Sequence, residues 1–469
     1  MTPLGAIYVP LILVCFLWRP SYLLPLWIIA SIFEAGSLYN GIVGDFEFGV
    51  SPFFLIEIFI LLRFALQLVQ GAKLLPPKDS PVRRLAVVLC ALWAWAFASA
   101  FILPRIFAGT LVASPRANVE DFTPLQWTLS NLAQAGYLTL NVGTVLYAIH
   151  CVRTEEQTKQ LMKALSWALL IAVLVGLAQF VSFQEGWDYP YELFNNNPTY
   201  AHGIDQELGD VHRVNSTFTE PSNAGSYLAA LLCGLVAGFL RGGRTARWVW
   251  AILGTLTVLL LTTSSTGFVA LAGGSFLLMI YFNPFRNSSA VSWTIVLVFV
   301  GVAAAVLLLT PDLLLAITAM TVEKGETYSF WVRVADEIRS LEIFVSTYGL
   351  GVGLGSNRSS GLITTMLSTV GIVGTGLFAT IYFLITRAFL RNPVSRSFQV
   401  IFWALVTLTI AQSVAVPDLN RPVLWTMFLL AFTQLSVGFV GHPSRESARI
   451  TGRSAVRSAP HAPDVAPAR

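Results

Sequence analysis

Long apolar segments follow one another along the chain from its first residues to about residue 440. Most have about 17–25 residues, the length that a helix needs to cross the ~30 Å hydrocarbon core of a bilayer. They lack sustained alternation of apolar and polar residues and are too long for barrel strands, so we predict helices. The predicted spans are 4–18, 20–36, 51–70, 85–102, 127–149, 161–183, 223–240, 248–263, 266–282, 290–310, 361–388, 398–416 and 423–440.

The number of spans is open between about twelve and thirteen. The first two are short and meet at Trp18-Arg19-Pro20, whereas 248–282 is too long for one span and has a predicted turn at Thr262–Gly267. The sequence therefore predicts an all-α, polytopic membrane protein with a single transmembrane domain over residues 1–440. Residues 441–469, rich in Arg, Ser, Ala and Pro, are expected to form a disordered basic tail.

The composition agrees with a membrane protein. Of the 469 residues, 55% are hydrophobic and 12% are charged, and the mean hydropathy is +0.68. A soluble globular protein carries about a quarter charged residues, so this chain has too few to cover a surface that faces water. The excess apolar side chains are therefore expected to face the lipid bilayer.

The distribution of Lys and Arg predicts the orientation of the helices in the membrane. Alternate connections hold nearly all of the cations, among them Lys73, Arg83, Arg153 and Arg241, and these connections and the tail are expected in the cytoplasm. The connections in between are rich in Asp and Glu. The two longest of them, 184–222 and 311–360, are therefore predicted to be extracytoplasmic loops.

Several common chemistries are missing from the sequence. It has no phosphate-binding P-loop, dinucleotide fingerprint, HExxH or CxxC motif, and the cytoplasmic connections are too short for a nucleotide-binding domain. His202 and His212 are the histidines in the outer segments, and we favour ordinary solvated side chains over a metal site built from them. We expect no metal, no cofactor and no nucleic-acid partner.

A small group of arginines in outer segments stands out, because the positive-inside rule disfavours them there: Arg213, Arg333, Arg339, Arg358 and Arg421. Each could pair with a nearby acid, as Arg333 could with Asp336 or Glu337 at helical spacing. For two of these arginines, the position in the sequence favours a functional role over a simple ion pair. Arg213 begins the segment RVNSTFTEPSN, which leads into a helix, and Arg333 lies upstream of the glycine-rich segment GLGVGLGSNR at 349–358.

Guanidinium groups and backbone N–H groups at a helix start both suit phosphate. We therefore predict an anionic substrate carried by a lipid. The glycines also fit a second interpretation, because glycine lets helices pack closely in membranes. The candidate substrate-binding residues are Arg358, Arg339, His212, Asn215, Asn223, Gly351 and Gly353.

The Arg213–Asn223 segment, followed by an apolar helix from Ala224, resembles the bacterial O-antigen ligase/polymerase (Wzy) superfamily. The turn at 261–267 is similar to that family's Ser-rich break between two spans. The stretch from Arg333 to Gly374 is similar to its second signature, an arginine followed by Gly-x-Gly-x-Gly and a helix. The order of these motifs covers roughly residues 120–440.

The resemblance implies a GT-C-like fold in the bacterial inner membrane and glycosyl transfer on its outer, periplasmic face. The donor would be an undecaprenyl-diphosphate-linked oligosaccharide. Arg213 and Arg333 would hold the diphosphate and stabilise it as it leaves, which would make the enzyme independent of metal. A chain-length regulator protein is a further partner that the resemblance implies.

Glu220 is the candidate catalytic base and His212 a less favoured one, whereas a carboxylate at a helix start also serves as a capping partner. Ligases of the family carry a histidine in the long outer loop, and 311–360 has none. The Glu220-Pro221-Ser222 variant also looks more like the polymerases, so we favour a polysaccharide polymerase over a ligase.

A flippase or transporter of lipid-linked glycans is the alternative from another class. It would be expected to show internal repeats and charges along a central passage, and neither is apparent in the sequence. Two ionisable residues, Glu57 and Arg63, lie within one predicted span. We expect them to have a structural role in the helix bundle, because this span lies outside the motifs.

Overall fold

The structure is a computed structural model that describes residues 1–43, 46–113, 122–200, 202–203, 206–208, 211–242, 245–282, 328–391, 395–415 and 417–438. The predicted span 290–310, the tail at 441–469 and the first part of the predicted loop 311–360 lie outside the described residues.

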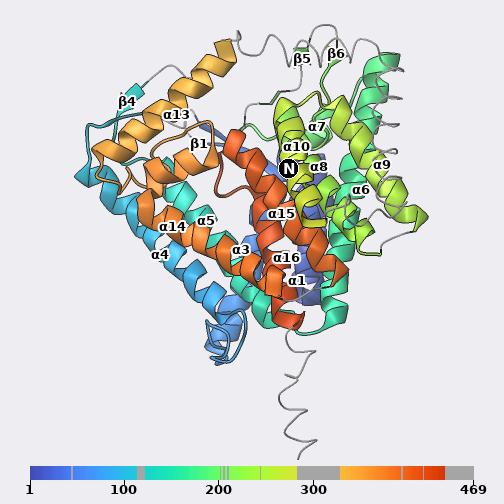
Figure 1. The fold of residues 1–469 in the computed structure, drawn as a ribbon, viewed down its shortest axis with the longest axis horizontal. Helices are drawn as coiled ribbons and strands as arrows, with labels where there is room; N and C mark the ends of the chain where they lie inside the picture. The colour runs from blue at the N-terminus through green and yellow to red at the C-terminus, as the bar shows by residue number, and fades with distance from the viewer. Residues whose placement is uncertain are drawn as a thin grey trace, which may run out of the picture.

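Helices dominate the described residues, which confirms the prediction of an all-α polytopic membrane protein (Figure 1). In chain order they are α1 (Pro3–Leu17), η1 (Pro20–Tyr22), α2 (Leu23–Ala30), α3 (Pro52–Val69), α4 (Arg83–Ile106), α5 (Leu129–Cys151), α6 (Glu155–Glu185), α7 (Tyr191–Phe194), α8 (Pro221–Leu240), α9 (Ala246–Leu261), α10 (Ser265–Phe282), α13 (Tyr328–Ser346), α14 (Leu362–Arg391), α15 (Arg396–Val414) and α16 (Pro422–Gly438).

Eight described helices are long and apolar enough to cross a membrane: α3, α4, α5, α6, α8, α10, α14 and α15. Four shorter apolar helices, at Pro3–Leu17, Pro20–Ala30, Ala246–Leu261 and Pro422–Val437, coincide with four more of the predicted spans. The described apolar helices thus coincide with the predicted spans, and four of them are shorter than the 18 residues of a full span. Helix α13 was not predicted, because the sequence pattern placed its residues in a loop.

Among the described residues, three short antiparallel hairpins lie between helices. They pair β1 (Tyr39–Val43) with β2 (Phe46–Val50), β3 (Leu111–Ala113) with β4 (Phe122–Pro124), and β5 (Glu207–Leu208) with β6 (Val211–His212). We call the end of the helix bundle that holds these hairpins the loop-bearing end. Figure 1 shows α13 at this same end, with β5 and β6, near the top of the view. The connections 70–82 and 152–154 belong to the opposite end, where α8 also ends.

Local sequence explains where the long helices begin and end. Helix α6 begins after Thr154, whose hydroxyl and the Gln157 side chain form a reciprocal capping box. It ends at Gly186, whose φ of 71° suits glycine at a helix C-terminus. Helix α8 begins at Pro221, because proline at the first helical position loses no intrahelical hydrogen bond.

Helix α8 is the most enclosed of the long helices and packs against α9, α10 and α15. Small residues make this possible. A Cβ at Gly234 would lie 2.5 Å from the carbonyl oxygen of Val400 in α15, so only glycine allows the two backbones to come this close. Since lipid does not drive helices together, such close packing is a main source of association within a membrane. It holds the first residues of α8 at the loop-bearing end.

Glu57 in α3 is fully buried in the bundle, where its Oε1 accepts a hydrogen bond of 3.2 Å from the indole Nε1 of Trp27 in α2. This contact ties α3 to α2, which supports the structural role expected for Glu57.

Candidate functional site

Arg213 follows strand β6, and its side chain reaches the turn between α9 and α10. Its Nε donates to Thr263 Oγ1 at 3.1 Å and to Thr262 O at 3.4 Å, and its Nη2 donates to Thr263 O at 3.4 Å. Its Nη1 donates to Gln206 Oε1 at 3.1 Å. These acceptors are all neutral, so they orient the guanidinium without cancelling its charge. One N–H on each terminal nitrogen has no partner among the described residues, and the two could bind phosphate oxygens.

The turn that holds Arg213 has an unusual backbone. Thr263 has a φ of 45°, a conformation that is rare for a β-branched residue. In this conformation its hydroxyl and its carbonyl oxygen both accept hydrogen bonds from Arg213. Strain of this kind persists where surrounding structure enforces it and is frequent at functional sites. The Ser-rich turn recognised in the sequence is therefore the support of the Arg213 side chain.

The rest of the Arg213–Asn223 segment is anchored by Gln179 of α6. The Gln179 Oε1 accepts from the backbone N–H groups of Asn215 at 3.1 Å and Ser216 at 2.8 Å, and its Nε2 donates to Asn215 Oδ1 at 2.6 Å. Ser216 adopts a φ of 54° at this point. The Asn215 side chain is fully buried in these contacts, so the structure gives it a role in shaping the segment rather than in contacting a substrate.

Glu220 is the residue before the first turn of α8. Its side chain does not cap that helix, and its Oε2 accepts a hydrogen bond of 3.1 Å from the hydroxyl of Ser222. The side chain is half-buried. A carboxylate held at the boundary of the protein without a capping bond can accept a proton from a bound ligand.

Arg333 lies in α13 and is half-buried. The carboxylates of Asp336 and Glu337 accept hydrogen bonds from Ser360 at 3.1 Å and Ser359 at 3.2 Å, and no ion pair with Arg333 is found among the described residues. Its charge acts instead on Arg213. Burial lowers the pKa of the Arg213 guanidinium, the Glu220 carboxylate raises it, and the positive charge of Arg333 lowers it further.

Glu220 and Arg333 therefore both lie within electrostatic reach of Arg213. We call the three residues the Arg213 cluster. They come from three elements: the segment after β6, the start of α8, and α13. The fold thus brings together the three residues that the sequence predicts to be catalytic.

Arg421 lies at the start of α16 and is fully buried. Its Nε lies 3.4 Å from Oε1 of Glu34, its Nη1 donates to Ser226 Oγ at 2.7 Å, and its Nη2 donates to the backbone oxygen of Asn223 at 2.9 Å. The Asn223 side chain donates to Thr219 Oγ1 at 2.6 Å. Arg421 is thus a fixed connection between the first turns of α8 and α16, and Asn223 takes part in it.

Asp418 precedes Arg421 and is exposed to water, as is Tyr200. Surrounding protein nevertheless raises the pKa of both side chains. For Asp418 burial raises the pKa, whereas a backbone hydrogen bond from Asn420 and the charges of Arg358 and Arg421 lower it. Arg358 is exposed, so its guanidinium is open to a ligand.

We call Asp418, Arg358, Tyr200, Glu34 and Arg421 the Asp418 cluster. Asp418 and Glu220 both act electrostatically on Glu34. Glu34 therefore links this cluster to the Arg213 cluster, and the two form one continuous charged region at the loop-bearing end.

Gly351 and Gly353 have φ angles of 79° and 99°. Their backbone N–H groups donate to Thr347 Oγ1 at 3.0 Å and to Thr369 O at 2.8 Å, so neither amide is free for phosphate. A Cβ at Gly353 would lie 2.6 Å from the carbonyl oxygen of Ser99 in α4. The glycine-rich segment therefore packs closely between α4 and α14, which is the second of the two interpretations that the sequence allowed.

Two predicted residues are engaged elsewhere. Arg339 pairs with Glu342 at 2.9 Å and lies over the ring of Phe122, with 5.3 Å from Cζ to the ring centroid. The His212 Nδ1 lies 3.2 Å from Glu207 Oε1, and its ring stacks on Phe183. Each thus has the contact with a neighbouring acid that is expected for an ordinary surface residue.

Sequence reasoning missed Gln179, Thr263, Glu34 and Asp418. A signal existed for Gln179, a polar residue within an apolar span, because such residues usually have a partner inside the protein. Comparison of the sequence with protein-family models and with curated proteins returned no match.

Proposed function

We propose that this multi-pass membrane protein is a polymerase of lipid-linked oligosaccharide repeat units, working on the outer face of the bacterial inner membrane. The observation that supports this function is the convergence of Arg213, Arg333 and Glu220 from distant segments at the loop-bearing end. Two cations beside a carboxylate suit the transfer of a sugar from a diphosphate to a hydroxyl group.

The donor is an oligosaccharide on undecaprenyl diphosphate. A hydroxyl oxygen of the acceptor attacks the anomeric carbon, the bond from that carbon to the phosphate oxygen breaks, and the lipid diphosphate leaves. Negative charge grows on the leaving phosphate. Arg213, held by neutral acceptors with free N–H groups, and Arg333 stabilise that charge with no reorganisation.

The acceptor is the sugar of a second lipid-linked repeat unit, lying beside the Asp418 cluster. Its hydroxyl proton passes to a carboxylate. Glu220 is one candidate, because its charge acts on Arg213. Asp418 is a second one, because its raised pKa makes it a stronger base than an ordinary aspartate. A chain-length regulator protein would set how often the cycle repeats.

The function is tested with the glycans of a strain that lacks the gene. Loss of a polymerase leaves single repeat units on the lipid carrier and its acceptors, and the gene restores long chains. Loss of a ligase leaves full-length chains on the lipid carrier, and loss of a flippase leaves repeat units on the inner leaflet. Either of those results would overturn the proposal.

Purified protein in liposomes gives the matching biochemical test. With lipid-linked repeat units supplied on the outside, we expect longer chains to form, and to form equally in the presence of EDTA. A requirement for a divalent metal would contradict the role given to the arginines.

A further inference from the structure

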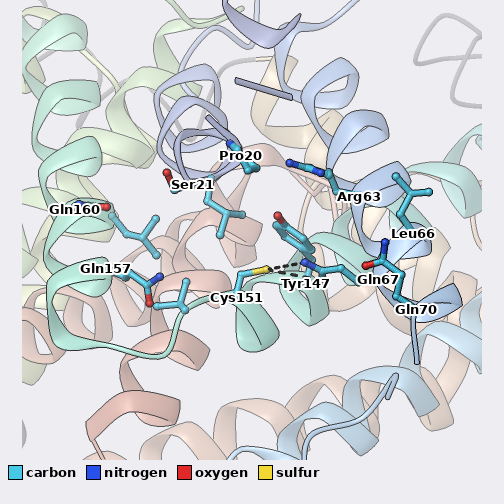
Figure 2. A pocket seen from close by; sticks show the side chains of 13 residues that line it. Pro20, Ser21, Arg63, Leu66, Gln67, Gln70, Tyr147, Cys151, Gln157 and Gln160 are labelled. Atoms are coloured by element: carbon cyan, nitrogen blue, oxygen red, sulfur yellow. Dashed lines mark hydrogen bonds between the residues drawn. The ribbon is translucent and has the colours of Figure 1, made fainter. Parts of the chain in front are cut away.

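A cavity of about 340 Å³ lies at the opposite end of the bundle, away from the charged region (Figure 2). It is formed by η1 and the first turn of α2, the last turns of α3 and α5, and the first turns of α6. These elements end together at the level where a membrane-spanning bundle meets water. The cavity is therefore placed at the depth of lipid headgroups.

The cavity has one charged group, the guanidinium of Arg63. None of the 13 lining residues is acidic, and Arg63 forms no ion pair in the part of the chain that the structure describes. Its described contact is with an aromatic ring, at 5.6 Å from Cζ to the centroid of Phe16. An arginine within a membrane span that lacks an acidic partner is costly unless an anion or water reaches it.

The walls of the cavity match both parts of a lipid. Polar side chains of Ser21, Gln70 and Gln160 line it, and all three are exposed and can donate hydrogen bonds. Leu24 and Leu161 supply apolar surface. Figure 2 shows Arg63 and Tyr147 on one side of the cavity, and Ser21 and Gln160 on the other.

The cavity lies beside surface that faces lipid. Leu62 and Leu66 flank Arg63 on α3 and are 50% and 51% exposed. The same end carries Lys73, Lys78 and Arg153, whose charges would concentrate anionic lipids there. A ligand that enters the cavity from this lipid-facing surface comes from the bilayer and therefore carries an acyl chain.

We propose that this cavity binds the phosphate headgroup of an anionic phospholipid from the leaflet at this end, with Arg63 holding the phosphate. The guanidinium gains the anion that the described residues do not provide, the exposed amides and hydroxyl bind the remaining oxygens, and the acyl chains lie along α3. This site is separate from the charged region and does not depend on the proposed function.

The test measures lipid binding to the purified full-length protein in detergent by native mass spectrometry. Phosphatidylglycerol and phosphatidylcholine with the same acyl chains are compared. We expect tighter binding of phosphatidylglycerol, weakened at least about tenfold by Arg63→Gln because a charged hydrogen-bonded pair is lost. Arg241→Gln is the matched control, since Arg241 lies at the same end of the bundle but outside the cavity, over the rings of Tyr281 and Phe282. This variant should bind phosphatidylglycerol as tightly as the wild type does.

Gln160→Glu is a second variant for the case that Arg63→Gln fails to fold. Gln160 is exposed, so the change leaves packing intact and adds a negative charge at the cavity, and phosphatidylglycerol binding should weaken. Unchanged binding in both variants would overturn the proposal. Thermal stabilisation by inorganic phosphate, as large as that by phosphatidylglycerol and lost in Arg63→Gln, would also overturn it by assigning the site to free phosphate.

Discussion

Arg421 and Glu34 are 387 positions apart in the sequence and form a buried ion pair, with 3.4 Å between Nε and Oε1. The Arg421 side chain is fully buried, and that of Glu34 is 10% exposed. The pair fixes the start of α16 to the segment after α2, and the hydrogen bonds from Arg421 to Ser226 and Asn223 extend it to the first turn of α8. The geometry of the charged region therefore depends on a buried ion pair within it.

Arg421→Ala should destabilise the protein strongly. The change leaves the Glu34 carboxylate buried without its cation, which typically costs about 3–5 kcal/mol. A double variant, Arg421→Met with Glu34→Leu, should recover part of the loss because no charge then stays buried. The measurements are membrane abundance and the melting temperature in detergent. Arg339→Ala, which breaks an exposed pair with Glu342, should cost less than about 1 kcal/mol. Equal melting temperatures for Arg421→Ala and Arg339→Ala would contradict this account.

Arg213→Lys and Arg333→Lys should each nearly abolish chain extension while membrane abundance stays normal. Lysine keeps the charge but loses the planar fork that holds two phosphate oxygens. If the fork stabilises the leaving diphosphate, its loss costs on the order of 3 kcal/mol, which is more than about a hundredfold in rate. The measurement is polymer length and rate in liposomes.

The control for the arginine variants is Arg105→Lys, at an exposed position near the end of α4. It should be nearly silent. Near-normal polymer from both Arg213→Lys and Arg333→Lys would remove these residues from the site and leave the membrane fold unaffected.

Gly353→Ala should lower the melting temperature and the abundance of the protein. The new Cβ would lie 2.6 Å from Ser99 O, and the φ of 99° is unfavourable for any residue with a side chain. Gly376→Ala in α14 is the control, since a Cβ there meets nothing within 4 Å and alanine favours the helix. If Gly353→Ala folded normally and lost only substrate binding, the glycine-rich segment would be a phosphate site after all.

Asp418→Asn should raise the melting temperature near neutral pH. Burial raises the pKa of Asp418 above its ordinary value of 3.8, so the folded protein binds this proton more tightly than the unfolded chain does. Stability is therefore lost as the pH rises from about 3.8 through the raised pKa, and asparagine avoids this loss. Melting curves across a pH series should converge below pH 3.8, where Asp418 is protonated in both states. A lower melting temperature for Asp418→Asn near neutral pH would show that the ionised form is the stable one.

Reporter fusions should place residues 78 and 200 on opposite sides of the membrane. Residue 78 lies between α3 and α4 among cations, and residue 200 lies after α7 at the loop-bearing end. A reporter that works in the cytoplasm should be active at 78 and silent at 200, and a periplasmic reporter should give the reverse. The reverse pattern would invert the orientation and move the charged region to the cytoplasm.

The sequence predicted the described helices closely. The predicted spans 51–70 and 223–240 correspond to α3 at Pro52–Val69 and α8 at Pro221–Leu240, and the turn at Thr262–Gly267 separates α9 from α10. Helix α13 was missed because it is amphipathic and carries charges such as Arg333 and Glu337, so no apolar run marks it. Apolar length identifies helices that face lipid and does not identify one that lies across the end of a bundle.

The sequence by itself determined the membrane class, the helices and the identity of the candidate arginines, because these depend on short segments and on composition. Tertiary structure alone decided which charges meet. The charge of Arg333 acts on Arg213, whereas Arg339 pairs with Glu342 and Arg421 is buried on Glu34. The four have the same side chain, and what distinguishes them is the packing of distant helices around each guanidinium. That packing sets burial and the distance to other charges, two quantities that a local sequence pattern does not contain.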